Sequence, residues 1–450
     1  MNPERSGTAP AVVPSLYRAV WRWHFYAGLF CMPFVLWLAT TGTIYLWKPQ
    51  IEAWLERPYD TLTPSGPRAS ADAQVKVALA AVPGAVLHKY QLPQAPGEAA
   101  RVILGRDGRE TRVYVDPYRL RVLRTETESE RPMRVISDLH GTFRAGNPGS
   151  WLVEIAACWT VTMLLTGLYL WWPRRTRGLG GVLYPRLRGG KRLFWRDLHA
   201  VSGIWVAVLA LFLISTGLPW AKFWGSYFKD VRAITGTLDG PQDWPTGARN
   251  AMLGDHAEHE GMTMPHAPAL GGDLDRVVAA VYPLGIAPPV LLAPPAARGT
   301  AWTVTSDAAN RPLRTSITVD GRSGALTSRR DFAERHWLDR AVGYGIAAHE
   351  GTLFGVANQL LGTLTALLLA TLSASGVVMW WRRRPDGSLG APVPLSRPRY
   401  GPLLIGAILL LAMAMPLFGA TLVLAAMCDR LLLPRWPVAQ RWLGLVPIRA

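Results

Sequence analysis

Five long apolar runs divide the chain, and they determine the fold we expect. They cover residues 24–47, 151–172, 199–221, 354–381 and 401–427. A helix of about 20 apolar residues is long enough to cross the hydrocarbon core of a bilayer. The first run has no small-residue cleavage site and is too long for the apolar core of a signal peptide, so we expect a retained helix. The pattern predicts an α-helical polytopic membrane protein.

The segments between the runs differ in charge, and the difference predicts an orientation. The short segments 1–23, 173–198 and 382–400 hold 16 Lys and Arg residues against 3 acidic residues. The long segments 48–150 and 222–353 hold 28 basic residues against 26 acidic ones. Because short basic loops stay in the cytoplasm, we expect the N-terminus inside and both long segments outside.

The fifth run, residues 401–427, allows two paths. A single crossing, which we expect, puts the tail 428–450 outside, although that tail carries four arginines. Pro416 lies in the middle of the run, so the alternative is a re-entrant hairpin that returns the tail to the cytoplasm. The positive-inside rule favours this alternative.

Composition supports a membrane protein and excludes several other classes. Half of the residues are hydrophobic and only 18% are charged, against about 25% in soluble domains. The net charge of +17 comes mostly from the short basic segments, so it is an orientation signal and no nucleic-acid surface is expected. Cys31, Cys158 and Cys428 all lie in apolar runs, which argues against a disulfide framework or a cysteine-based metal site.

The chain contains an internal duplication. His24 and His199 each stand 17 residues before a Thr-Gly step, and His140 and His349 each stand 31 residues before a Trp-Trp pair followed by arginines. Each half therefore consists of a helix, an external segment and a second helix, and the fifth run follows them. Both halves begin on the same side, so they are parallel repeats, and equivalent residues share one depth in the membrane.

The external segments also resemble each other. In the first, a helix over 71–82 is followed by strand-like alternation at 101–105 and 111–116. In the second, a helix over 273–281 precedes strand-like stretches at 289–293, 301–305 and 314–319. We expect two small α+β modules, each with three short antiparallel strands that end in an Asp turn.

A module with a Val-Asp-x-x-x-x-x-Leu turn, set between helices that end in Gly-x-x-x-Trp-Trp-x-Arg-Arg, resembles the PepSY-associated transmembrane proteins. This family includes iron-regulated inner-membrane proteins and haem-containing ferric-siderophore reductases of Gram-negative bacteria. The resemblance covers roughly residues 15–385. It implies two PepSY-like periplasmic modules, haem, and a location in the bacterial inner membrane. The fused flavin and nicotinamide region of some relatives is absent here, so the electron donor is expected to be a separate cytoplasmic protein or a quinol.

The duplicated histidines are the candidate haem ligands. His24 and His199 form one pair of equal depth near the cytoplasmic side, and His140 and His349 form a second pair near the outer side, roughly 30 Å away. A b-type haem held by two imidazoles needs one histidine from each of two facing helices. We therefore expect two bis-histidine haems. The alternative for each histidine is a structural role at the membrane interface.

The small residues of the repeats have two possible roles. The Thr-Gly and Ser-Gly steps at Thr41, Thr166, Thr216 and Ser375 offer room for a porphyrin or for ordinary helix packing.

Two further features are candidates for function. The stretch GDHAEHEGMTMPHAP contains His256, His259, His266, Met262 and Met264, and imidazole with thioether suits copper, zinc or iron. Instead of a metal site, this stretch could be a loop that contacts the substrate or an exposed flexible loop. Glu154, just inside the second run, is either a functional buried carboxylate or a residue that reaches the outer interface. His88 and His336 are expected to be structural.

These features favour a redox enzyme that passes electrons across the membrane to a ferric siderophore or another ferric chelate and releases ferrous iron. A non-enzymatic protein that binds or regulates through its modules is one alternative. An accessory protein or transporter for metal uptake is another, although the helices lack the polar breaks typical of transporters.

Overall fold

The computed structural model describes residues 15–173, 178–238, 244, 246, 272–295, 299–392 and 400–445. The five histidines and methionines of the 256–266 stretch lie outside these residues. The described chain forms two compact units. The first unit comprises residues 1–39, 154–214 and 367–450, and the second comprises residues 40–153 and 215–366.

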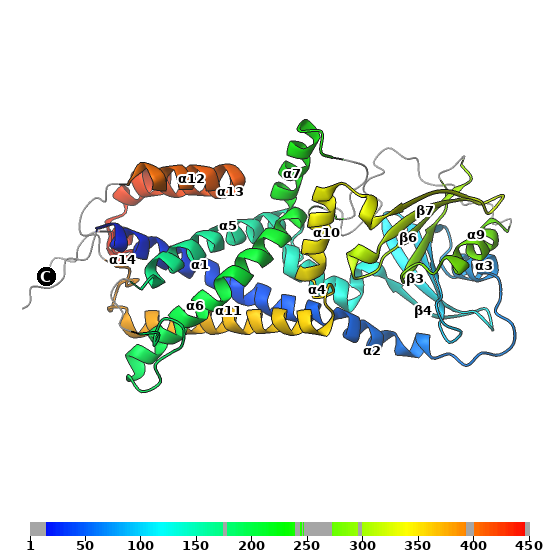
Figure 1. The fold of residues 1–450 in the computed structure, drawn as a ribbon, viewed down its shortest axis with the longest axis horizontal. Coiled ribbons are helices and arrows are strands. Elements are labelled where there is room, and N and C mark those ends of the chain that lie inside the picture. The colour runs from blue at the N-terminus through cyan, green and yellow to red at the C-terminus, as the bar shows by residue number, and fades with distance from the viewer. Residues whose placement is uncertain are drawn as a thin grey trace, which may run out of the picture. The chain divides into compact units, whose positions relative to one another are not determined.

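Among the described residues, five helices are long and apolar enough to cross a membrane: Leu16–Leu46, Gly146–Trp171, Lys191–Trp220, Val356–Arg383 and Pro416–Arg435. The first four correspond to α1 (Ser15–Leu46), α5 (Gly146–Trp171), α6 (Lys191–Gly217) and α11 (Val356–Arg383) (Figure 1). In the first unit, Leu164 of α5 packs with Ala207 and Ala210 of α6 and with Leu369 of α11. Apolar side chains on the outside, such as Val208 at 73% exposure, face the surroundings, as lipid-facing residues do.

The second unit is built around one antiparallel sheet. Its strand order is β4-β3-β2-β1-β5-β6-β7-β8. The strands are β1 (Val86–Leu92), β2 (Ala100–Arg106), β3 (Arg109–Asp116), β4 (Arg121–Thr127), β5 (Val290–Ala293), β6 (Ala301–Ser306), β7 (Thr315–Asp320) and β8 (Leu326–Asp331). The two external segments therefore contribute four strands each, and they join where Tyr90 of β1 pairs with Leu292 of β5. The expected two separate three-stranded modules are a single eight-stranded sheet.

Two equivalent helices cover one face of this sheet. α3 (Ala71–Ala81) and α9 (Asp273–Val281) lie side by side there (Figure 1). Val75 and Ala78 of α3, at helical spacing, are fully buried against the strands, as are Leu274 and Val277 of α9. The core of the second unit thus lies between this helix pair and the sheet, and both halves of the duplication contribute to it.

The expected Asp turns are present at equivalent places. Asp116 ends β3, and its Oδ1 accepts hydrogen bonds from the backbone N–H groups of Tyr118 and Arg119. Asp320 ends β7 and accepts in the same way from Arg322 and Ser323. A carboxylate that accepts from the following N–H groups stabilises a tight turn.

Further helices connect the sheet to the long helices. They are α2 (Lys48–Asp60), α4 (Pro132–Thr142), α7 (Lys222–Ile234) and α10 (Trp337–His349). α2 follows α1 and α7 follows α6, whereas α4 precedes α5 and α10 precedes α11. The pattern of apolar residues does not predict α2, α4 and α7.

The fifth apolar run forms a hairpin. α12 (Pro402–Ala414) and α13 (Pro416–Met427) are separated by Met415, whose φ of −132° and ψ of 81° break the helix. A Cβ atom on Gly419 would lie 3.1 Å from Cβ of Ala412. In one straight helix these positions are seven residues, or about 10 Å, apart, so the chain folds back at Pro416. Residues 401–427 therefore form two helices that fold back on each other and not the one straight helix that a single crossing over this range would need.

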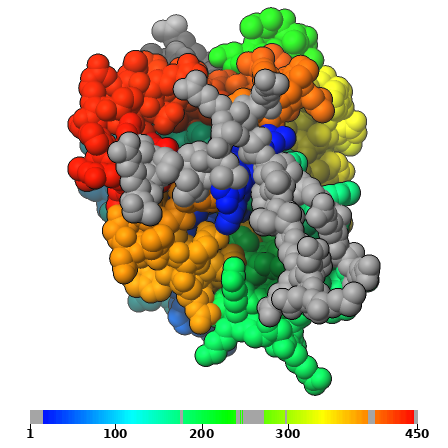
Figure 2. Space-filling model, turned by 90° about the vertical axis from the view of Figure 1, so that its left-hand side faces the viewer, coloured from blue at the N-terminus to red at the C-terminus, as the bar shows by residue number. Residues whose placement is uncertain are grey.

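The C-terminal segment returns to the start of α1. The Tyr26 hydroxyl donates to the backbone oxygen of Leu443 at 2.5 Å, and Arg22 donates to that of Gly444 at 3.0 Å. The backbone N–H of Leu389, after α11, donates to Trp442. Figure 2 shows this end of the first unit, with the red C-terminal segment next to the blue start of α1. The tail therefore lies at the end of the unit that carries the basic segments.

Candidate cofactor site

His24 and His199 meet inside the first unit. His24 lies in α1 and His199 lies in α6, at equivalent positions of the two halves. Their ring centres are 6.3 Å apart and their ring planes are nearly perpendicular, at 82°. The structure thus brings together the pair that the duplication predicts.

Each of these rings is held through Nδ1 by a neighbouring helix. Nδ1 of His24 lies 3.0 Å from the backbone oxygen of Met163 in α5. Nδ1 of His199 lies 3.0 Å from the backbone oxygen of Leu372 in α11. Because a carbonyl oxygen only accepts, Nδ1 must carry the proton in both rings. The neutral imidazoles then keep the lone pair on Nε2, the atom available to bind a metal.

A hydroxyl group supports each of these hydrogen bonds. Oγ1 of Thr166 lies 3.2 Å from Nδ1 of His24, and Oγ of Ser375 lies 3.2 Å from Nδ1 of His199. Thr166 donates its own proton to the Thr162 or Met163 oxygen, and Ser375 donates to Leu372. Both hydroxyl oxygens are therefore free to accept from the rings, and each Nδ1–H has two acceptors.

Glycine follows each hydroxyl residue because an imidazole occupies the space where a side chain would be. A Cβ atom on Gly167 would lie 3.0 Å from Cε1 of His24, and one on Gly376 would lie 3.4 Å from Cε1 of His199. The small residues of the Thr-Gly and Ser-Gly steps therefore admit a histidine ring of the neighbouring helix.

In the second unit, hydroxyl groups also lie next to the rings of His140, at the end of α4, and His349, at the end of α10. Nδ1 of His140 lies 3.0 Å from Oγ1 of Thr41 in α1, and Nδ1 of His349 lies 3.0 Å from Oγ1 of Thr216 in α6. A Cβ atom on Gly42 would lie 3.1 Å from Cε1 of His140. The same hydroxyl-glycine pair thus holds all four duplicated histidines.

The ring of His349 also contacts an aromatic side chain and lies close to a glycine. The ring centre of Trp220 lies 5.8 Å from that of His349, with the ring planes at 90°. A Cβ atom on Gly217 would lie 3.3 Å from Cε1 of His349. Three residues at the end of the span Lys191–Trp220 therefore lie around this ring, since Thr216 adds the hydrogen bond described above.

The inner pair fits a metal held between two imidazoles. A histidine nitrogen lies about 2 Å from a bound metal, so two imidazole rings that shared one metal would have centres about 6 Å apart. The measured 6.3 Å agrees with this spacing. Within the described residues, Nε2 of His24 and of His199 makes no hydrogen bond. Two neutral imidazoles of this kind are a donor set that would hold the iron of a b-type haem if one were bound here.

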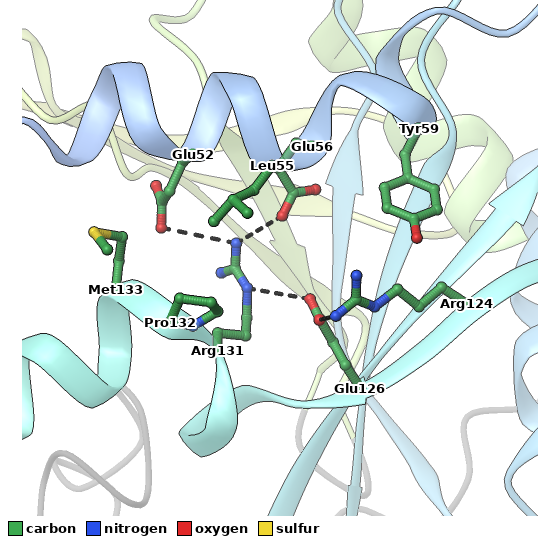
Figure 3. Close-up of a pocket in the computed structure, with 9 residues that line it drawn as sticks. All are labelled: Glu52, Leu55, Glu56, Tyr59, Arg124, Glu126, Arg131, Pro132 and Met133. Atoms are coloured by element: carbon green, nitrogen blue, oxygen red, sulfur yellow. Dashed lines mark hydrogen bonds and ion pairs between the residues drawn. The ribbon is translucent and has the colours of Figure 1, made fainter.

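A charged cluster in the second unit fastens α2 to the strand and helix that lead to His140. Arg131, just before α4, pairs with Glu56 at 2.9 Å, with Glu126 at 3.3 Å and with Glu52 at 3.8 Å (Figure 3). Glu126 also binds Arg124 at 2.6 Å. Burial by itself would raise the pKa of Glu56, but the guanidinium groups of Arg131 and then Arg101 outweigh it and lower that pKa.

The acids and bases of this cluster compensate one another. Arg101 pairs with Glu56 and with Asp60 of α2, and the Tyr114 hydroxyl donates to Glu56 at 2.8 Å. Guanidinium groups bonded to several carboxylates at once hold secondary elements together. The cluster therefore has a structural role. It fixes the position of α4, and with it His140, relative to α2.

The remaining predicted residues have structural surroundings. Nδ1 of His88 in β1 lies 3.0 Å from Glu110, and His336 caps the start of α10. Glu154 in α5 is 1% exposed, so its side chain is buried within the protein. Within the described ranges, no three His, Cys, Asp or Glu side chains gather as a metal-binding group.

Comparison with protein families identifies the chain. The model of the PepSY-associated TM region matches residues 21–383. This range includes all four duplicated histidines and the residues that hold them. No curated protein matches the chain.

Proposed function

The chain belongs to the PepSY-associated transmembrane family, and from this premise we propose that it is a haem-containing membrane reductase. It transfers electrons from a donor on the basic side of the membrane to a ferric siderophore or another ferric chelate on the other side, and ferrous iron is released. The membrane is the bacterial inner membrane, with the N-terminus in the cytoplasm and the eight-stranded sheet, built from two PepSY-like halves, in the periplasm.

The observation that carries the proposal is the inner histidine pair. Two neutral imidazoles with fixed Nδ1 protons and a ring separation of 6.3 Å are a preorganised ligand set. When bound there, haem supplies one-electron transfer. His24 and His199 hold the inner group, while Met163, Leu372, Thr166 and Ser375 orient the two rings. His140 and His349 hold an outer group, which Thr41 and Thr216 orient in the same way.

The chain's own hydrogen bonds contribute to tuning as well as to binding. A carbonyl that accepts from Nδ1–H increases the basicity of the other ring nitrogen and fixes the ring. The first unit provides this acceptor from two different helices, α5 and α11. The periplasmic sheet is the part proposed to contact the ferric chelate. The electron donor is a separate cytoplasmic protein or a quinol.

Spectroscopy of the purified protein tests the proposal. We expect a reducible Soret band and two haems per chain. His199→Ala should remove the inner haem and leave a folded protein with one haem, and His140→Ala should remove only the outer one. His336→Ala is the matched control, because His336 caps a helix through its side chain and should leave both haems. A colourless protein would favour a binding or regulatory role for the sheet and would refute the reductase.

Sidedness is tested separately in membrane vesicles. A ferric chelate that cannot cross the bilayer should be reduced only when it is presented to the face that carries the sheet. Equal reduction from both faces would contradict transfer across the membrane, whatever the haem content.

A further inference from the structure

Two arginines of the first unit lie in register with the inner histidine site. Arg192 stands seven residues before His199 in α6, and Arg383 stands seven residues after Gly376 in α11. Seven residues make about two helical turns, roughly 10 Å along the axis and within about 20° around it. Because the ring of His199 packs on Gly376, both arginines lie on the sides of α6 and α11 that face each other.

Both arginines lie on the same side of the histidine pair along the helix axes. A Cβ atom on Gly203 would lie 3.5 Å from Cδ1 of Leu372. Gly203 follows His199 by four residues, whereas Leu372 precedes Gly376 by four, so α6 and α11 run antiparallel. The start of α6 and the end of α11 therefore lie at one end of the first unit, together with the start of α1 (Figure 1). This is the end that carries the basic segments.

Arg383 also reaches α1, the helix of His24. The centre of its guanidinium group lies 5.0 Å from the ring centre of Trp21, and Trp21 stands three residues before His24. A guanidinium group over an indole ring is held by cation–π attraction. The side chain of Arg383 is thus positioned between α11 and α1, at the basic end of the histidine pair.

The two arginines carry like charges close to each other. The charge of Arg192 acts on Arg383, and like charges repel. In the part of the chain that the structure describes, neither guanidinium group forms an ion pair or a hydrogen bond, and both side chains are exposed. Arg186 and Arg196, at the same end, are both paired with Asp197. Two neighbouring cations without such an acidic partner favour a bound anion.

We propose that Arg192 and Arg383 bind the two propionates of the inner haem. The inference rests on the proposed function, because it needs haem between His24 and His199. Charged groups are costly in the hydrocarbon core, so the propionates of a haem held there are expected to point to the nearer interface, which is the basic end of the unit. Two guanidinium groups balance two carboxylates, and the planar fork of each can donate two parallel hydrogen bonds to one carboxylate.

The phosphate of an anionic lipid is the competing anion for these arginines. A lipid headgroup needs only exposed cations at the membrane surface. It does not need cations in register with His199 and Gly376, nor one held over Trp21 beside the helix of His24. This placement around the histidine pair favours the carboxylates of a ligand that the same pair holds.

Haem and its dimethyl ester, in which both propionates are methylated and uncharged, test the proposal. The haem-free full chain with His140→Ala is placed in phosphatidylcholine nanodiscs, so that the inner site is titrated without anionic lipid. Arg192→Gln and Arg383→Gln are compared with Arg382→Gln in this background. Arg382 is the matched control because it is exposed and adjacent in α11, but it lies about 100° away from Arg383 around the helix.

We expect haem to bind roughly tenfold or more tightly than the ester, both in the starting variant and with Arg382→Gln. Arg192→Gln and Arg383→Gln should each reduce this preference, and together they should abolish it while the affinity for the ester stays unchanged. The midpoint potential of the inner haem should fall in the same variants, because the loss of a nearby cation stabilises ferric iron, the more positive state.

The outcomes separate this inference from the proposed function. Equal affinity for haem and ester in the starting variant would overturn the inference but leave the histidine ligands in place. Equal loss of affinity for both compounds in the arginine variants would also overturn it, because it assigns the arginines to packing. So would loss of the preference when phosphatidylglycerol is added, which assigns them to lipid phosphate. Failure to bind either compound would refute the reductase itself.

Discussion

The two inner glycines provide a sharp test of how the histidine rings are held. Gly167 and Gly376 are equivalent residues, yet the space over them differs. The added Cβ atom would lie 3.0 Å from Cε1 of His24 at Gly167, but 3.4 Å from Cε1 of His199 at Gly376. We therefore expect Gly167→Ala to displace a histidine ring and Gly376→Ala to be tolerated.

The expected magnitude follows from these distances. An ordinary carbon–carbon contact is about 3.5 Å or longer, so alanine at position 167 requires the His24 ring to move by about 0.5 Å. A shift of this size away from α5 would stretch the 3.0 Å contact to Met163 to the limit of a hydrogen bond. Overpacking costs about 1–3 kcal/mol, and a weakened hydrogen bond costs about 1 kcal/mol.

The resulting loss of about 2 kcal/mol corresponds to roughly 30-fold weaker haem binding at the inner site. Alanine also favours a helix over glycine by about 1 kcal/mol, but this gain applies to both variants and cancels in the comparison. Gly376→Ala should therefore bind haem like the unaltered protein.

Two assays read out the comparison. Haem content per folded chain, titrated with added haem, measures the binding difference. Thermal unfolding of the haem-free protein measures the packing difference without any cofactor, and Gly167→Ala should be the less stable of the two variants. Equal behaviour of the two variants in both assays, or a larger loss for Gly376→Ala, would refute the reasoning.

The remaining predictions concern charges of the second unit. Arg131→Ala leaves Glu56 and its neighbours without their shared cation and should lower the free energy of unfolding by about 3 kcal/mol, measured by denaturant titration. Because the pKa of Glu56 is lowered on folding, its ion pairs stabilise the protein above the ordinary carboxyl pKa, and that stability is lost as the pH falls through the lowered value. The Arg131→Ala variant should therefore lose less stability than the unaltered protein on acidification, as thermal unfolding against pH would show. Burial, and then the charge of Asp275, raise the pKa of Asp72, so the protein loses stability as the pH rises through that window. Asp72→Asn should accordingly unfold at a higher temperature than the unaltered protein at pH 7, but not at pH 4.

The sequence predicts the histidine pairs because the duplication places equivalent residues in equivalent surroundings. It did not predict the partners of the rings. Thr166 and Gly167 are recognisable as small residues, but only the packing of α1 against α5 shows that they face His24. The missing information is which side of each helix meets its neighbour, and a periodic apolar run does not contain it.

The strands that were missed share a physical explanation. β1 pairs with β2 through an irregularity between Leu87 and Lys89, which interrupts the alternation of apolar residues. β4 and β8 lie at the two edges of the sheet and carry many exposed residues, so neither shows a buried face. The fusion of the two halves through β1 and β5 depends on a contact between distant segments, and local patterns do not encode it.

The pairing of β1 with β5 has a consequence for the history and the engineering of the chain. Each half supplies an edge strand that the other half covers, and each half supplies one histidine of the inner pair. A symmetric homodimer has this property, since each subunit offers the same surface to its copy. A gene for one half alone would encode a subunit with an open strand edge, prone to pair with itself. Joining the halves in one polypeptide frees each copy to diverge. Glu154, for example, is a buried carboxylate, and the equivalent position of the second half, 209 residues later as for His140 and His349, is Thr363.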